Sequence, residues 1–174
     1  MCYRVWPLLA CLLLLPACGP PQSRLPATSW QQRVDGPRVE YRLAAELNLP
    51  DGLRIALNQG LQLRFLFSAR RYRQGNWYRQ QTARWQQSQA VRYSALTGHY
   101  RLQYAQGWRT LAEWREVVRE LGRQQWRWPV AAGQQRVEVR WRLDMASLPP
   151  SLRLQALRDP SLRFDTGWQV LHEP

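Results

Sequence analysis

Strict alternation of apolar and polar residues constrains the fold of this chain more than any other feature. From Val39 to Leu49 every second residue is apolar, and polar residues such as Glu40 stand between most of them. Residues 61–69 and 136–143 repeat the pattern. A period of two residues is that of a β-strand with one buried face. Strands that are apolar on one side only are typical of antiparallel sheets.

Turn-forming pairs separate these segments and indicate further strands. Asp35-Gly36, Gly75-Asn76 and Thr97-Gly98 are pairs that suit tight turns. We therefore expect structure to begin near Trp30, and further strands to cover residues 79–96, 100–104 and 163–171.

A different period predicts the main helix at about 111–121. Apolar residues there recur at helical spacing. Thr110 and Glu113 have the spacing of a capping box, and Gly122 can end the helix in a left-handed cap. Short helical turns are expected at 53–58 and 151–157. The predicted fold class is α+β and β-rich: an antiparallel sheet or β-sandwich of six to seven strands, one main helix and short helical turns.

The N-terminal segment resembles an export signal. Its apolar run of about eleven residues, 7–17, is too short to span a bilayer as a helix, and its small-residue end is typical of a signal peptide. The sequence Leu15-Pro16-Ala17-Cys18 is that of a lipobox, which makes Cys18 a lipidation site. The alternative is ordinary secretion with cleavage elsewhere.

The lipobox interpretation divides the chain into three parts. Residues 1–17 are a signal peptide, 18–29 a lipid-attached Pro-rich tether and 30–174 a single α+β domain. Gly19 follows the cysteine, where an aspartate commonly retains lipoproteins at the inner membrane. We therefore expect an exported protein of the cell envelope, lipid-anchored at the outer membrane and facing the periplasm.

The charge of the chain indicates its partners. The net charge is +13, and all 25 basic residues are arginine. A basic domain often binds nucleic acid, but export points to phosphate groups of the envelope instead, which arginine binds well. We expect a membrane contact through the lipid anchor, a protein partner in the envelope or anionic lipid, and no nucleic acid.

Cations and aromatic residues interleave around the Gly75-Asn76 turn. Such a hairpin suits phosphate headgroups with interfacial aromatics, or an acidic protein partner. The plain alternative is a solvated hairpin whose aromatics pack across strands. For the tryptophans of Trp126-Arg127-Trp128-Pro129 we expect plain packing. The candidate binding residues of the hairpin are Arg70, Arg71, Tyr72, Arg73, Trp77, Tyr78, Arg79, Arg84 and Trp85.

Several segments in order resemble one bacterial family. They are LRIALNQGLQLRF, RYSALTGHYRLQY, RWRLDMASLPPSLRLQAL and the C-terminal DTGWQV. Together they are similar to the bacterial domain of unknown function 4390, from about Val34 to the C-terminus. The resemblance implies a protein exported by proteobacteria and assigns no catalytic residues. Its most specific part, of unknown role, comprises Arg142, Leu143, Asp144, Leu148 and Pro149, followed by Leu154 and Leu157.

Residues that could carry catalysis are few. His99 and His172 are the only histidines and neither has a partner at metal-ligand spacing, so we predict no metal site, no cofactor and no catalytic set. Asp144 ends a predicted strand, where its side chain can cap the amides near Ala146 and Ser147. Glu113, Glu116 and Glu120 are expected on the solvated face of the helix, partly paired with Arg119 and Arg123.

Three functional hypotheses follow from the sequence. The first is a non-enzymatic, lipid-anchored domain that binds a protein partner in the envelope. The second is direct binding of anionic lipid or lipopolysaccharide through the hairpin. The third is an envelope hydrolase that uses Asp144, although no acid–base pair is visible in the sequence.

Overall fold

The computed structural model describes residues 28–74, 79–104 and 106–171, and confirms the α+β, β-rich class. Two antiparallel sheets contain its strands. The small sheet has the order β1-β2-β7, with β1 at Thr28–Asp35, β2 at Arg38–Ala45 and β7 at Arg123–Pro129. The large sheet has the order β6-β5-β4-β3-β8-β9. Its strands are β3 (Leu63–Gln74), β4 (Arg79–Ser94), β5 (His99–Tyr104), β6 (Gly107–Leu111), β8 (Gln135–Leu143) and β9 (Gln169–Leu171).

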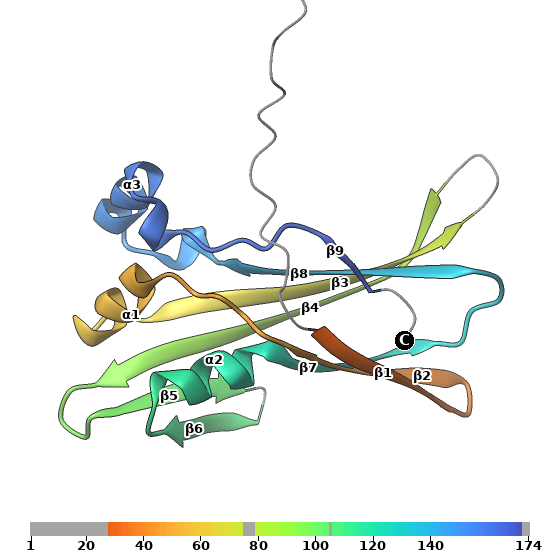
Figure 1. Cartoon of the computed structure of the whole chain (residues 1–174), viewed down its shortest axis with the longest axis horizontal. Helices are drawn as coiled ribbons and strands as arrows, with labels where there is room; N and C mark the ends of the chain where they lie inside the picture. The colour runs from red at the N-terminus through yellow and green to blue at the C-terminus, as the bar shows by residue number, and fades with distance from the viewer. Residues whose placement is uncertain (1–27, 75–78, 105, 172–174) are drawn as a thin grey trace, which may run out of the picture.

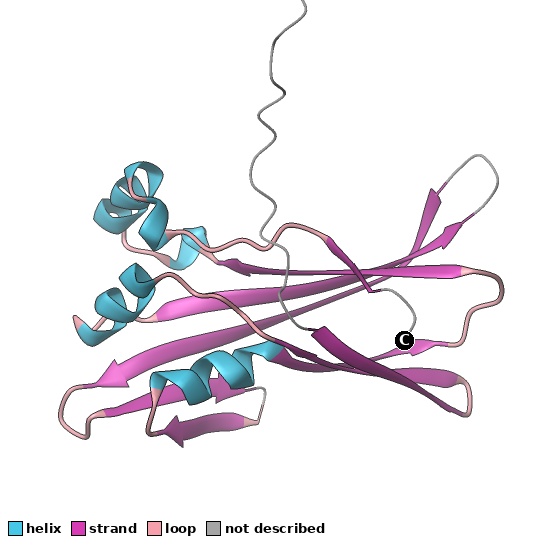
Figure 2. Ribbon diagram, in the orientation of Figure 1, coloured by secondary structure: helices cyan, strands magenta, loops and turns pink. Residues whose placement is uncertain are grey.

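Helices lie at the end of the large sheet and beside the small one (Figure 1). α1 (Asp51–Asn58) and α3 (Pro150–Arg158) gather at one end, where the 3-10 helices η1 (Met145–Ser147) and η2 (Pro160–Leu162) connect the chain. α2 (Trp114–Gly122) leads directly into β7. Figure 2 shows β3, β4 and β8 running side by side along the long axis of the molecule.

Aromatic side chains fill the core between the two sheets. Tyr41 and Trp126 of the small sheet stack with ring centroids 5.2 Å apart. Phe67 of β3 lies 5.3 Å from Trp126 and 4.9 Å from Trp141 of β8. Trp126 and Trp128 are both buried, which confirms the packing expected for them. Offset and tilted ring pairs of this kind add to the free energy of burial.

The alternation predicted from the sequence is largely confirmed. In β2 every second side chain from Val39 to Ala45 is buried, as predicted. In β8 the apolar residues of the alternating segment 136–143 are buried as well: Val137, Val139, Trp141 and Leu143. Two glutamates are exceptions, because the solvated face predicted for Glu40 and Glu138 is wrong. Glu40 is buried beside Arg127 and Gln125, and Glu138 is buried as well. Its buried position is explained by the arginines around it, described below.

The main helix begins later than the sequence predicts. The structure begins α2 at Trp114, because Thr110 and Leu111 belong to β6 and pair with β5. The capping box is real but lies three residues further on: the backbone N–H of Glu113 donates to the Glu116 carboxylate at 3.3 Å. Because Thr110 and Leu111 continue the edge strand β6, the first helical turn forms only after them.

Gly122 ends the helix for a different reason from the one expected. It is absent from the glycines with positive φ, so no left-handed cap forms there. A Cβ on Gly122 would instead overlap the carbonyl oxygen of Ala45. The glycine therefore permits the backbone of α2 to approach β2, which fixes the helix against the small sheet.

The described residues form nine strands, where the sequence predicted six or seven. β1, β6 and β7 were not predicted, and β1 is exposed along nearly all its length. The last predicted strand, 163–171, is reduced to β9, since η2 ends at Leu162 and only an isolated bridge follows at Asp165. The turns at Gly36 and Gly98 have positive φ, as their sequences indicated. The Gly75-Asn76 turn lies outside the described residues.

Candidate functional site

One face of the large sheet points away from the small sheet, and we call it the outer face. Paired residues on neighbouring strands share a face, and successive residues alternate between faces. Because Phe67 and Trp141 point into the core, their neighbours Ser68 and Arg140 point outward. Pairing across the sheet extends this assignment to the other strands.

Arginines from four strands share the outer face. Ser68 and Ala90, which have small side chains on the same face, are buried, because longer side chains such as arginine can cover them with their aliphatic parts. Glu138 is the only acidic residue in the described strands of the large sheet. The arginines are Arg64, Arg70, Arg79, Arg84, Arg92, Arg101, Arg136, Arg140 and Arg142.

Glu138 organises one half of this face. Its carboxylate accepts the Nε of Arg70 at 2.8 Å and the Nε of Arg136 at 2.9 Å. The guanidinium of Arg79 lies 3.3 Å away. One buried carboxylate thus holds three guanidinium groups, so this cluster keeps a net positive charge.

Aromatic rings lie between the arginines of the cluster. The guanidinium carbon of Arg70 is 3.7 Å from the ring centroid of Trp168 and 5.1 Å from that of Tyr72. Arg79 lies 5.2 Å from the same Tyr72 ring. Cation–π contacts at these distances fix the arginine side chains without neutralising their charge.

A second cluster lies on the outer face at β4, β5 and β6. The guanidinium carbon of Arg92 is 4.7 Å from the Trp108 ring, and that of Arg101 is 5.9 Å away. The Nε of Arg101 is buried without a hydrogen-bond partner. Arg142 pairs with Asp165 in a β-bridge, and its charge lowers the pKa of that carboxyl. Arg64, Arg92 and Arg101 form no ion pair with any residue that the structure describes. They remain available to an external anion.

Asp165 supplies the other carboxylate of this region. Its side chain pairs with Arg140 through both guanidinium nitrogens Nε and Nη2. Burial alone would raise the pKa of Asp165, but the hydrogen bond from Arg140 and the amide of Gly167 hold that pKa below its usual range. The same bond raises the pKa of Arg140. This pair is therefore fixed in its charged form.

The structure divides the residues of the predicted hairpin surface. Arg70, Tyr72, Arg79 and Arg84 lie on the outer face. Arg71 does not: it is only 4 % exposed, points to the inner side, and donates to the carbonyl oxygen of Pro129 at 2.8 Å.

The remaining hairpin candidates do not join the outer face either. The pairing register places Arg73 and Trp85 on the inner side, with Arg71 and Ala69. Trp77 and Tyr78 lie outside the described residues.

Sequence reasoning missed most of the outer face, because it searched for neighbours along the chain. Arg64, Arg92, Arg101, Arg136 and Arg142 come from four strands, β3, β4, β5 and β8. Their common signal in the sequence is an outward position next to inward apolar residues of an alternating segment. Only the pairing register reveals that they meet on one face.

The family-like motif has a structural role around Asp144. The side chain of Asp144 accepts the N–H of Ala146 at 3.2 Å, as expected for a cap. Its own N–H donates to the carbonyl oxygen of Arg64 at 2.7 Å. Leu143 and Leu148 are buried, whereas Arg142 and Pro149 are exposed. The motif thus ends β8 and directs the chain towards α3.

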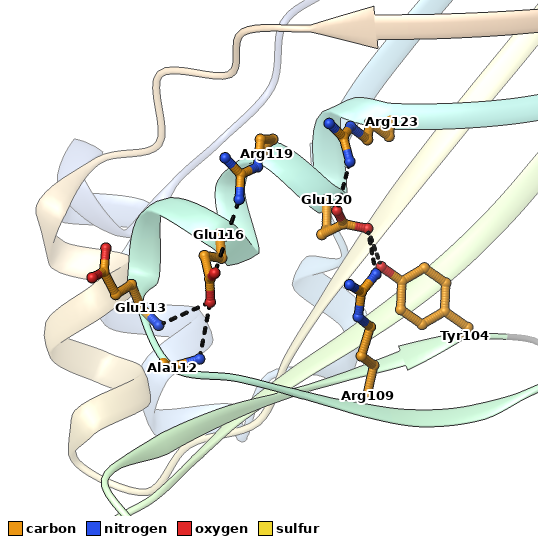
Figure 3. Close-up of polar contacts among 8 residues, drawn as sticks. All are labelled: Tyr104, Arg109, Ala112, Glu113, Glu116, Arg119, Glu120 and Arg123. Atoms are coloured by element: carbon orange, nitrogen blue, oxygen red, sulfur yellow. Dashed lines mark hydrogen bonds and ion pairs between the residues drawn. The ribbon is translucent and has the colours of Figure 1, made fainter.

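The carboxylates of α2 pair with arginines, and Glu116 also accepts the backbone N–H groups of Ala112 and Glu113, as Figure 3 shows. Glu116 pairs with Arg119 at 3.9 Å, and Glu120 with Arg123 at 3.0 Å, as expected. Glu120 is less solvated than predicted, because the hydroxyl of Tyr104 also donates to it at 2.8 Å. Burial and this bond raise the pKa of Tyr104 to about 12.

The described residues contain neither a metal-binding cluster nor a membrane-spanning helix. These residues contain no group of three or more histidine, cysteine or acidic side chains that could hold a metal ion. None of their helices is long and apolar enough to cross a membrane. Cys18 and His172 lie outside the described part of the chain.

Comparison with known proteins identifies a family and nothing closer. A family model described as a domain of unknown function, DUF4390, matches residues 28–172, which is most of the chain. No curated protein matches, and neither does any solved structure. The chain therefore belongs to the DUF4390 family.

Proposed function

We propose that this chain is a non-enzymatic, lipid-anchored domain of the cell envelope that holds its outer face against anionic phospholipid headgroups. The observation that carries the proposal is that arginines from separate strands gather around Glu138, the only carboxylate in the described strands of the large sheet. Several of these arginines have no ionic partner among the described residues. Guanidinium groups bind phosphate oxygens well.

The shape of the outer face favours a lipid surface over a small ligand. An extended sheet face spreads its charges broadly, whereas small-molecule sites are concave. Trp108 and Tyr72 stand among the arginines on this face. Such amphipathic rings prefer the headgroup region of a bilayer. Anchoring through Cys18 would keep the domain close to those headgroups.

Vesicle co-sedimentation tests this function. The chain from Gly19 onward, which has no acyl group, is mixed with phosphatidylglycerol vesicles and with phosphatidylcholine vesicles. We expect binding to the anionic vesicles alone, weakening from low salt to about 1 M salt as charges are screened. Equal binding to both vesicles, or binding insensitive to salt, would contradict the proposal. Stronger binding to lipopolysaccharide micelles would move the assignment away from phospholipid.

A protein partner is a second candidate, and the surface of α3 favours it. Leu154 and Leu157 of the family-like motif are exposed there, at 67 % and 63 %. Exposed leucines on one short helix are typical of a contact surface. Crosslinking in whole envelopes tests the candidate: a specific crosslinked protein should be lost when both leucines are changed to serine. A crosslinking pattern unchanged by Leu154→Ser and Leu157→Ser would contradict it.

A further inference from the structure

A groove lined by both polar and apolar atoms opens beside the small sheet, on the side away from the outer face. Its volume is about 480 Å³, within the range of small-molecule sites. Residues from β1, β2, β4, β5, α2 and β7 line it, so distant segments of the chain meet there. Five of them are glutamines: Gln87, Gln89 and Gln124 lie on the inward faces of the two sheets, whereas the pairing register places Gln31 and Gln125 on the outward face of the small sheet. We call it the amide groove.

Two of these amides are buried at the base of the groove and are only partly satisfied. Gln89 is 3 % exposed and Gln124 is 5 % exposed. The Nε2 of Gln124 donates to the Oε1 of Gln89 and to the carbonyl oxygen of Leu121, both at 2.8 Å. Among the described residues, the Nε2 of Gln89 and the Oε1 of Gln124 have no hydrogen-bond partner. The pair therefore presents a free donor and a free acceptor side by side.

The charged groups at the groove neutralise one another. The carboxylate of Glu120 is held by Arg123 at 3.0 Å and by Arg109 at 3.3 Å (Figure 3). Arg42 pairs with Glu40 at 3.2 Å. No arginine that lines the groove is thus left for an anion, in contrast to the outer face. The buried amides likewise disfavour an apolar ligand, because covering them without hydrogen bonds is costly.

We propose that the amide groove binds a neutral saccharide. Each sugar hydroxyl both donates and accepts a hydrogen bond, and a primary amide offers both functions in one plane. Trp30, partly exposed at the groove, adds an aromatic ring against which an apolar sugar face can lie. An extended peptide needs one donor and one acceptor per residue along a strand, whereas here several converge at one place.

Titration calorimetry tests the saccharide site. The complete chain, solubilised in a detergent without a sugar headgroup, is titrated with tetrasaccharides of glucose and of N-acetylglucosamine, and with tetra-alanine. We expect at least one tetrasaccharide to bind and the peptide not to bind. No saccharide binding at about 10 mM, where a site with a dissociation constant of 1 mM would be largely filled, would overturn the proposal. Tighter binding of the peptide would also overturn it.

Neighbouring glutamines of β4 provide a matched pair of variants. Gln87 lines the groove, whereas Gln86 lies on the opposite face of the same strand. Gln87→Ala should weaken saccharide binding about tenfold, the cost of a lost pair of hydrogen bonds, and Gln86→Ala should leave it unchanged. Equal effects of the two variants would overturn the proposal. Gln87 lies on the inward face of the large sheet, opposite the outer face, so Gln87→Ala should not alter vesicle binding. The saccharide site and the lipid-binding face can therefore be disproved independently of each other.

Discussion

At the scale of single residues, Glu138 decides how the outer face is built. A carboxylate in the middle of a sheet face would ordinarily be solvated, and its alternating position in β8 suggested that. Three guanidinium groups bury it instead. Without this carboxylate, Arg70, Arg79 and Arg136 would repel one another across adjacent strands.

Replacing Glu138 with glutamine should therefore destabilise the domain. Glu138→Gln keeps the size of the side chain but removes the charge that the three arginines share. We expect the free energy of unfolding to fall by about 1–3 kcal/mol, the range for hydrogen bonds to charged groups, as measured by urea denaturation. Asp51→Asn breaks an exposed pair with Arg54 and should change it by less than about 0.5 kcal/mol. Equal effects of the two variants would show that Glu138 has no organising role.

Tyr104 should make stability depend on pH at the alkaline end. Its pKa is about 12 in the folded protein, against 10.0 for an ordinary tyrosine. Between these values the unfolded chain has lost the proton that the folded chain retains, so stability falls as pH rises. The stabilisation is complete below pH 10 and is lost towards pH 12. Tyr104→Phe should remove this part of the slope in urea denaturation, and an unchanged slope would contradict the assignment.

At the scale of elements, close backbone approach fixes α2. The glycine after the helix was visible in the sequence, but its neighbour Ala45 lies far away along the chain. Gly122→Ala should overpack this contact and lower the free energy of unfolding by about 1–3 kcal/mol. Arg119→Ala, one turn earlier and exposed, should change it little. Thermal unfolding of both variants measures this, and equal melting temperatures would contradict the account.

The cap at the end of β8 gives a second test at this scale. Asp144 accepts a backbone N–H from Ala146, so Asp144→Ala should cost about 1 kcal/mol of stability. Asp144→Asn retains an acceptor oxygen and should preserve most of that stability. Because Asp144 acts as a cap and is not one of the binding arginines, both variants should bind phosphatidylglycerol vesicles equally well. If Asp144→Asn were as unstable as Asp144→Ala, the charge rather than the cap would matter.

Local patterns predicted most of the fold, and contacts between distant segments limited the rest. Alternation located β2, β3 and β8, because one buried face leaves a period of two in the sequence. β6 has no such pattern and is largely exposed, and β7 mixes glutamine with tryptophan on its inward side. Thr110 and Glu113 have the spacing of a capping box, but Thr110 pairs with Arg101 of β5 instead, and the helix begins only at Trp114.

At the scale of the whole molecule, the candidate site is made by strand order. The sequence predicted a binding surface on the segment from Arg70 to Trp85, but that segment supplies only part of the outer face. β8 joins β3 directly although more than sixty residues separate them in sequence, as Arg70 and Glu138 show. Composition revealed the excess of arginine, but only sheet order and register reveal where it accumulates.

The binding of two charge-matched triple variants to phosphatidylglycerol vesicles tests the central claim most directly. One variant replaces Arg64, Arg92 and Arg142 of the outer face with glutamine, and the other replaces Arg33, Arg115 and Arg119 elsewhere. Each basic residue near an anionic surface contributes about 1 kcal/mol. The outer-face variant should therefore bind roughly a hundredfold more weakly, while the other binds nearly as the unchanged chain does. Equal losses in both variants would show that net charge, and not the outer face, holds the protein to lipid.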